Sequence, residues 1–148
     1  MYSFKTITII ESKIDNVFEF FCNAENLQKL TPPSLDFKII TKIPFKLKKG
    51  SIIDYRIKLY GVALKWKTEI TNWDPPYRFE DSQLKGPYKI WKHSHIFNPI
   101  GNKTEMIDIV KYIPKGWPFT FLINNLFVKK EIEKIFYYRT QKIIEIFN

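Results

Sequence analysis

The chain has 148 residues, enough for one domain with a sizeable hydrophobic core and too few for two ordinary domains. Hydrophobic residues make up 45% of it and aromatic residues 17%, which excludes a disordered chain, and no apolar run approaches the ~20 residues of a membrane span. The formal net charge of +9 is compatible with binding to nucleic acid, to anionic lipid or to an acidic partner. We therefore expect one folded domain over residues 1–148, without stable membrane insertion.

The N-terminal residues lack the basic start, apolar stretch and small-residue cleavage site of a secretory signal. A single cysteine, Cys22, cannot form an internal disulfide, and its place after two phenylalanines indicates an inert core thiol. These features predict a cytoplasmic protein, which we expect to be a monomer.

Alternating β-branched and polar residues predict a strand over 4–11, followed by two short helices that break near Asn23 and stop at Thr31-Pro32-Pro33. Turn-forming Gly, Pro and Asn residues then separate six further expected strands: 37–42, 52–59, 64–73, 78–84, 88–97 and 104–113. The short loops between them predict antiparallel neighbours.

The last predicted element is a long helix from Val128 to Phe147, because apolar residues recur there with a helical period. Its apolar side comprises Val128, Ile132, Ile135, Phe136, Ile143, Ile146 and Phe147. Arg139 interrupts this side, so its guanidinium either finds a buried carboxylate, Asp81 or Asp108, or extends to water. We expect residues 114–127 to form a separate turn or a kinked first segment of the helix.

Lysines alternate with apolar residues along the strands and do not join into a basic stripe: Lys38, Lys42, Lys58, Lys65, Lys67 and Lys92. We interpret them as the solvent side of half-buried strands. Large aromatic residues occupy the opposite parity, whereas a nucleic-acid site needs stacked aromatics and lysines on one surface. We therefore predict no nucleic-acid partner.

The predicted inward side also carries polar groups among its aromatic residues. Asp108 should lie opposite His93 or one pair away, with Asp81 or Gln83 about one strand further. Buried polar atoms need partners, so this patch indicates a binding site more than an ordinary core. The predicted ligand-binding residues are Tyr55, Trp66, Phe79, Asp81, Gln83, Tyr88, Trp91, His93, His95, Met106, Asp108, Tyr112 and Arg139.

A resemblance to a known superfamily rests on the run Phe79-x-Asp81-x-Gln83-x-x-Gly86-Pro87-Tyr88-x-x-Trp91-x-His93-x-His95-x-Phe97, then Thr104, Asp108, Val110 and Tyr112. The run resembles the START-like superfamily of birch-pollen-allergen-type (Bet v 1-like, SRPBCC) helix-grip folds. Leu30-Thr31-Pro32-Pro33 and Phe136-x-Tyr138-Arg139 fit as well, so the likeness covers nearly the whole chain. Within the superfamily, the chain is most similar to short bacterial polyketide cyclase/dehydrase-like or ligand-binding proteins.

This resemblance implies an α+β helix-grip fold. A curved antiparallel sheet of about seven strands would wrap round the long C-terminal helix, with two short helices after the first strand and a cavity between sheet and helix. Members of the superfamily include carriers of hydrophobic molecules and cyclases, so the fold does not choose an activity.

Three chemistries compete for the polar patch. We predict that the cavity binds a hydrophobic, lipid- or polyketide-like small molecule, since aromatic walls with a few polar groups suit such a ligand. The alternative is a cyclase/dehydratase-type enzyme in which Asp108 orients His93 as a general base. His93 and His95 near Asp108 could also hold a metal, but the chain has no third histidine and no additional cysteine, so we predict no metal and no cofactor.

Overall fold

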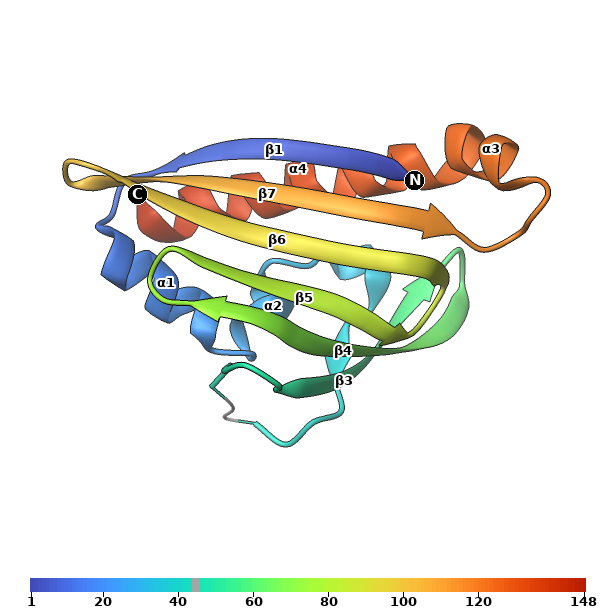
Figure 1. Cartoon of the computed structure of the whole chain (residues 1–148), viewed down its shortest axis with the longest axis horizontal. Coiled ribbons are helices and arrows are strands. Elements are labelled where there is room, and N and C mark those ends of the chain that lie inside the picture. The colour runs from blue at the N-terminus through green and yellow to red at the C-terminus, as the bar shows by residue number, and fades with distance from the viewer. Residues whose placement is uncertain (44–45) are drawn as a thin grey trace.

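The computed structural model describes residues 1–43 and 46–148, which build an antiparallel sheet that curves round a C-terminal helix (Figure 1). The sheet has seven strands in the order β1-β7-β6-β5-β4-β3-β2. The sequence predicts the antiparallel run from β2 to β7, and the pairing of β1 with β7 is added by the structure. Their bounds are β1 (Tyr2–Ile10), β2 (Lys38–Ile39), β3 (Ile52–Leu59), β4 (Val62–Asp74), β5 (Arg78–Lys85), β6 (Tyr88–Ile100) and β7 (Lys103–Pro114). The long connection between β1 and β2 leaves the first strand free to pair with the last.

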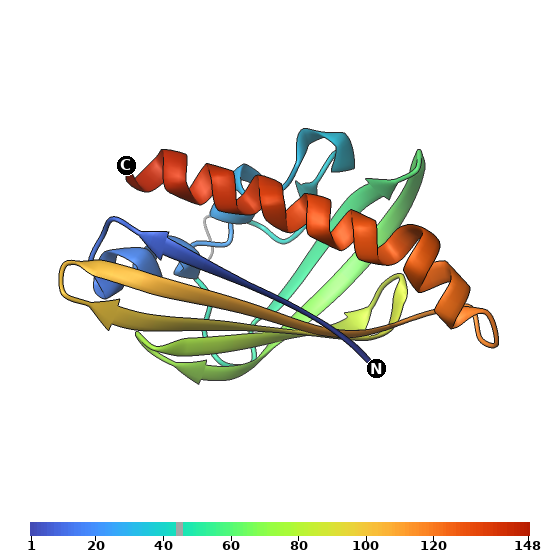
Figure 2. The same ribbon diagram turned by 90° about the horizontal axis from the view of Figure 1, so that it is seen from above.

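Two short helices, α1 (Ile14–Cys22) and α2 (Asn26–Lys29), follow β1, and a 3-10 turn, η1 (Pro33–Leu35), precedes β2. The chain ends in α3 (Thr120–Ile123), a π-helical turn η2 (Asn124–Val128) and α4 (Lys129–Phe147). Figure 2 shows α4 lying along the concave face of the sheet. In the described part of the chain, no helix has the length and apolar character needed to cross a membrane.

The C-terminal helical run starts earlier than its apolar period indicates. It begins at Thr120 and passes through the π-helical turn η2 into α4. Of the predicted segment 114–127, residues 115–119 form a turn and residues 120–127 form the first part of the helical run. Asn124 in η2 is buried, and its Oδ1 accepts a hydrogen bond of 2.8 Å from the hydroxyl of Tyr112 on β7. This bond ties the π-helical turn to the sheet.

Strand β2 is shorter than the predicted strand over 37–42. The amides of Ile40 and Thr41 both donate to the carbonyl of Asp54, and the hydroxyl of Thr41 accepts from the amide of Asp54 at 2.8 Å. Because the carbonyl of this one β3 residue accepts hydrogen bonds from two consecutive amides, the regular ladder of β2 and β3 ends after Ile39.

On the long strands, the residues predicted to face inward from the alternation of side chains do face the core or the cavity. On β7 the inward side is buried along its whole length: Thr104, Met106, Asp108, Val110 and Tyr112. From α4, Ile132, Phe136 and Ile143 complete the core, whereas Ile146 is 41% exposed, contrary to its place in the predicted apolar side. The β4–β5 pairing shifts register at two places, and such irregularities bend a sheet, which helps the strands curve round the helix.

Candidate functional site

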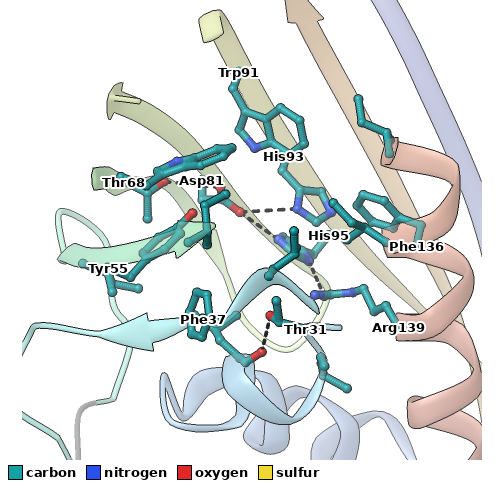
Figure 3. A pocket seen from close by; sticks show the side chains of 18 of the residues that line it. Thr31, Phe37, Tyr55, Thr68, Asp81, Trp91, His93, His95, Phe136 and Arg139 are labelled. Atoms are coloured by element: carbon teal, nitrogen blue, oxygen red, sulfur yellow. Dashed lines mark hydrogen bonds and ion pairs between the residues drawn. The ribbon is translucent and has the colours of Figure 1, made fainter. Parts of the chain in front are cut away.

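A cavity of about 160 Å³ lies between the concave face of the sheet and α4 (Figure 3). An apolar protein cavity of ~150 Å³ is known to admit benzene, so this space suits a molecule of about one ring. Its third side is formed by the segment between α1 and β2, which contributes Leu27, Leu30, Thr31, Leu35 and Phe37.

Aromatic side chains of three strands form one wall of the cavity. Trp66 on β4 stacks on Tyr55 of β3 with ring centroids 5.7 Å apart, and it meets Trp91 of β6 edge to face at 5.4 Å. Tyr88 packs on Trp91 at 4.7 Å. Tyr55, Trp66 and Trp91 converge because each occupies an inward position of its strand. Tyr88 has the opposite parity to Trp91, and the register irregularity between Tyr88 and Ile90 separates the two.

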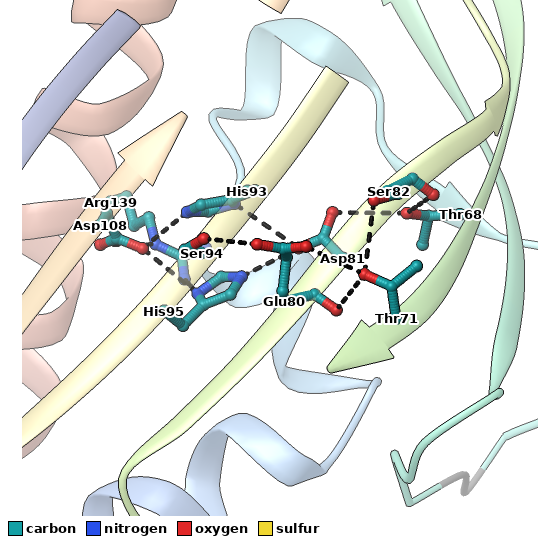
Figure 4. A network of polar contacts seen from close by, with 10 residues as sticks. All are labelled: Thr68, Thr71, Glu80, Asp81, Ser82, His93, Ser94, His95, Asp108 and Arg139. Atoms are coloured by element: carbon teal, nitrogen blue, oxygen red, sulfur yellow. Dashed lines mark hydrogen bonds and ion pairs between the residues drawn. The ribbon is translucent and has the colours of Figure 1, made fainter. Parts of the chain in front are cut away.

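Two histidines of β6 lie at the polar end of the cavity, between two carboxylates (Figure 4). Register pairs His93 with Asp81 of β5, and His95 with Asp108 of β7. The Oδ1 atom of Asp108 lies 2.7 Å from Nε2 of His93 and 3.2 Å from Nδ1 of His95. On the other side, Oδ2 of Asp81 lies 2.9 Å from Nε2 of His95 and 3.7 Å from Nδ1 of His93.

Arg139 reaches this cluster from α4. Its Nε lies 3.8 Å from Oδ2 of Asp108, and its Nη2 lies 3.4 Å from Nδ1 of His95. The guanidinium also lies over the ring of Phe21, 5.2 Å from the centroid. With only 8% of its surface exposed, Arg139 follows the buried alternative, with Asp108 as its nearer carboxylate.

Burial and mutual charge set the protonation of the cluster. Burial opposes ionisation of Asp108, but the charge of Arg139 and the hydrogen bonds from both histidines outweigh it and hold its pKa well below the usual range. Burial likewise opposes ionisation of Asp81, but the hydrogen bond and charge of His95, with the charges of His93 and Arg139, lower its pKa. Both carboxylates are therefore anionic.

The two histidines differ. Burial and the charge of His95 lower the pKa of His93, although Asp108 opposes this shift. Burial also disfavours a charged His95, but its contacts with Asp108 and Asp81 raise its pKa overall. A protonated His95 with a neutral His93 makes the formal charges of the two carboxylates, His95 and Arg139 cancel, which explains how a cluster this buried is stable.

The donor atoms of Asp81, His93 and His95 lie within 4.8 Å of one another, so these three residues are candidate metal ligands. The sequence pointed instead to Asp108 as the carboxylate beside the histidines. Both carboxylates face a histidine in register, but Asp81 lines the cavity and Asp108 does not.

Comparison with known proteins identifies the fold and no more. No family model matches the chain, and no curated protein matches it. Among solved structures, an aromatase/cyclase from Streptomyces sp. R1128 matches with a TM-score of 0.77 and 11% identity over 97% of this chain and 92% of that chain. A major latex-like protein from Panax ginseng matches with a TM-score of 0.59 and 20% identity over 90% and 95% of the two chains. A protein from Thermus thermophilus matches with a TM-score of 0.67 and 16% identity over 99% and 100%.

The chain has the START-like helix-grip fold. The predicted fold class is thereby confirmed. Identities this low carry no residue roles from one helix-grip protein to another.

The helix-grip cavity brings together most of the predicted ligand-binding residues. Those that line it are Tyr55, Trp66, Phe79, Asp81, Tyr88, Trp91, His93, His95 and Arg139. No ligand contact tests their role, which stays a prediction.

Four predicted site residues lie outside the cavity lining. The Gln83 amide instead closes the β5–β6 turn, donating to the carbonyl of Tyr88 at 2.8 Å and accepting from its amide at 3.2 Å. Met106 packs in the core beneath α1, and Tyr112 bonds Asn124. Asp108 lies behind the two histidines, so it acts on the cavity through them. All four residues occupy inward positions of their strands, as predicted, but they lie at points along the strands that the cavity does not reach.

Sequence reasoning missed the part of the lining that comes from helix and loop. The segment between α1 and β2 was singled out only as a helix stop, although Thr31 and Phe37 face the cavity (Figure 3). On α4, Glu131, Ile132, Ile135 and Phe136 also line the cavity, although none of them is among the predicted ligand-binding residues. The Thr-Pro-Pro motif of the resemblance is the signal in the sequence that points to the loop.

Proposed function

We propose that this protein binds a compact hydrophobic small molecule, lipid- or polyketide-like in character, between α4 and the sheet. The observation that carries the proposal is a cavity walled by Tyr55, Trp66 and Trp91, with a small polar cluster at one end. Apolar walls drive binding through burial of apolar surface, and a few fixed polar groups orient the ligand. The size of the cavity favours a ligand with a single ring or a short chain, or one that displaces α4 slightly.

Ligand occupancy is tested by native mass spectrometry of the protein purified from its host, and by displacement of an environment-sensitive dye with lipid- and polyketide-like compounds. Ile135→Trp should fill the cavity and weaken binding at least about tenfold, since the residue lines the cavity from α4. Tyr137→Trp is the matched control, because this side chain is 69% exposed on the same helix. No displacement across a broad library, or equal loss in both variants, would contradict the proposal.

The second candidate is a cyclase/dehydratase-type enzyme. It is favoured by the 2.7 Å contact between Nε2 of His93 and Oδ1 of Asp108, which orients the imidazole, and by the lowered pKa of His93, which keeps it neutral. Among the described residues, Nδ1 of His93 accepts no hydrogen bond, so it is available to take a proton from a ligand in the cavity.

Asp108→Asn separates the two candidates once a ligand is known. If the His–Asp pair is a general base, the substitution should abolish turnover and leave binding nearly intact. Glu105→Gln on the same strand is the control, because Glu105 pairs with Asn98 on the outer side. Binding without turnover in the unaltered protein supports the carrier.

A further inference from the structure

We propose that Asp81, His93 and His95 bind a divalent transition-metal ion of the Zn²⁺ class at the polar end of the cavity. The site goes beyond ligand binding and does not depend on it. It also revises the expectation from sequence, which lacked the strand register that adds Asp81 to the two histidines (Figure 4).

The donor atoms of the three residues all lie within 4.8 Å of one another, and the two distances from Asp81 suit one ion. Zn–N and Zn–O bonds of ~2.0–2.2 Å at the tetrahedral angle place ligand atoms roughly 3.3–3.5 Å apart. Oδ2 of Asp81 lies 2.9 Å from Nε2 of His95 and 3.7 Å from Nδ1 of His93, which brackets this value. The Asp81 side chain is 17% exposed and lines the cavity, so an ion can reach it from the cavity.

Asp108 supplies the support that metal-binding histidines need. A histidine ligand almost always donates its other ring N–H to a carboxylate or carbonyl, which fixes its tautomer and orientation. Oδ1 of Asp108 lies 2.7 Å from Nε2 of His93 and 3.2 Å from Nδ1 of His95. The remaining nitrogens, Nδ1 of His93 and Nε2 of His95, are those that face Asp81.

Charge and ligand type select the ion. The ion would displace the proton of His95, which leaves Asp81, Asp108 and Arg139 with a formal charge of −1 for the cation to compensate. Two imidazoles and one carboxylate suit Zn²⁺ and its transition-metal neighbours, whereas Ca²⁺ and Mg²⁺ prefer oxygen ligands throughout. All three ligands line the cavity, so a further coordination position would face the cavity.

The chain offers an unusually clean test, because it contains only two histidines and one cysteine. Cys22 is buried and its pKa is raised to about 11, so it does not supply a competing thiolate. In tag-free protein treated with a chelator, imidazole NMR signals therefore report on this site alone. ZnCl₂ should shift both rings with one-to-one stoichiometry, and calorimetry should give a Kd of ~1 μM or tighter.

Substitutions then assign the ligands. His95→Gln and Asp81→Asn should each weaken Zn²⁺ binding at least about 100-fold, and Asp108→Asn about 10–100-fold, as loss of a supporting carboxylate does. Glu80→Gln is the matched control, since Glu80 neighbours Asp81 on β5 but bonds Ser94 on the other side of the sheet. It should leave the affinity unchanged.

Two outcomes overturn the site. One is wild-type protein whose imidazole signals do not move at millimolar Zn²⁺, a result that needs no variant to fold. The other is Glu80→Gln weakening binding as much as Asp81→Asn, which places the ion elsewhere. Dye displacement from metal-free protein is measured separately, so failure of the metal site leaves the ligand-binding proposal to its own test.

Discussion

Arg139 connects the C-terminal helix to the polar cluster. Its guanidinium lies within 4 Å of Asp108 and close to His95, and its Nε is buried without a hydrogen bond in the described structure. A buried cation of this kind is stable because opposite charges surround it, and removal of one member leaves the others uncompensated. The residue therefore links α4 to the charge balance of the site.

Arg139→Met should destabilise the protein by about 3 kcal/mol or more, the range seen when one member of a buried pair is removed. The free energy of unfolding is measured by urea denaturation. Lys134→Met on the exposed side of α4 is the control and should change stability by less than ~1 kcal/mol. A shift below that value for Arg139→Met as well would rule out a stabilising buried contact.

Cys22 should be unreactive in the folded protein. Burial, then the charge of Glu19, raises the pKa of its thiol to about 11, although Lys46 opposes the shift. Between pH 9 and pH 11 the thiol of Cys22 stays protonated in the folded protein and ionises in the unfolded protein. The free energy of unfolding should therefore fall as the pH rises from about 9 towards 11. Iodoacetamide at pH 8 should label native protein far more slowly than urea-unfolded protein. Equal rates for the two would show an accessible thiolate.

At the scale of elements, side chains of the sheet position the parts around it. Gln83 closes the β5–β6 turn through both its amide atoms. A Cβ at Gly86 would lie 2.4 Å from Oε1 of Gln83, so glycine is needed for this closure. Tyr112 and Asn124 make the corresponding link between β7 and η2.

Substituting Asn124→Ala should cost about 1–3 kcal/mol, because the buried hydroxyl of Tyr112 loses its acceptor. In a double-mutant cycle with Tyr112→Phe, the combined variant should lose less than the sum of the two, by about 0.5–3 kcal/mol. Thermal or urea unfolding gives each value. Lys130→Ala, an exposed site on α4, should stay within ~0.5 kcal/mol. Additive effects would mean that the bond does not stabilise η2.

On the scale of the whole molecule, the two sides of the sheet have different roles. Lys58, Lys65 and Lys92 are exposed on the convex side, whereas Trp66 and Trp91 face the cavity on the concave side. Stacking and phosphate contacts therefore do not share one surface, which supports the expectation of no nucleic-acid partner. That expectation and the cytoplasmic location both stay predictions.

The protein should sediment as a monomer of 17.8 kDa at micromolar concentration. The surface most suited to self-association lies before α4, where four large apolar side chains are between 54% and 85% exposed: Trp117, Phe119, Phe121 and Leu122. Analytical ultracentrifugation over a tenfold range of concentration checks the prediction. If the mass rises, Phe121→Ser with Leu122→Ser should restore the monomer, and Ile100→Ser at the opposite β6–β7 turn should not.

The amino-acid sequence by itself determined the elements and their buried sides. The period of two along β7 and the helical period along α4 define which side chains share one face of each element, because side-chain direction follows from backbone geometry. The structure buries these faces. The pattern also predicted the antiparallel order of β3 to β7, since the loops between these strands are short. In the same way, it brought His93, His95, Asp81 and Asp108 to one patch.

Only the tertiary structure decided which of these residues face the cavity. Register places Asp81 opposite His93 and sets Asp108 behind both histidines, a distinction of one strand that periodicity does not contain. The return of residues 27–37 over the sheet adds Thr31 and Phe37 to the lining. The distance of α4 from the sheet decides whether Arg139 meets Asp108 or water. These outcomes depend on contacts between segments far apart in the chain, and local patterns do not encode such distances.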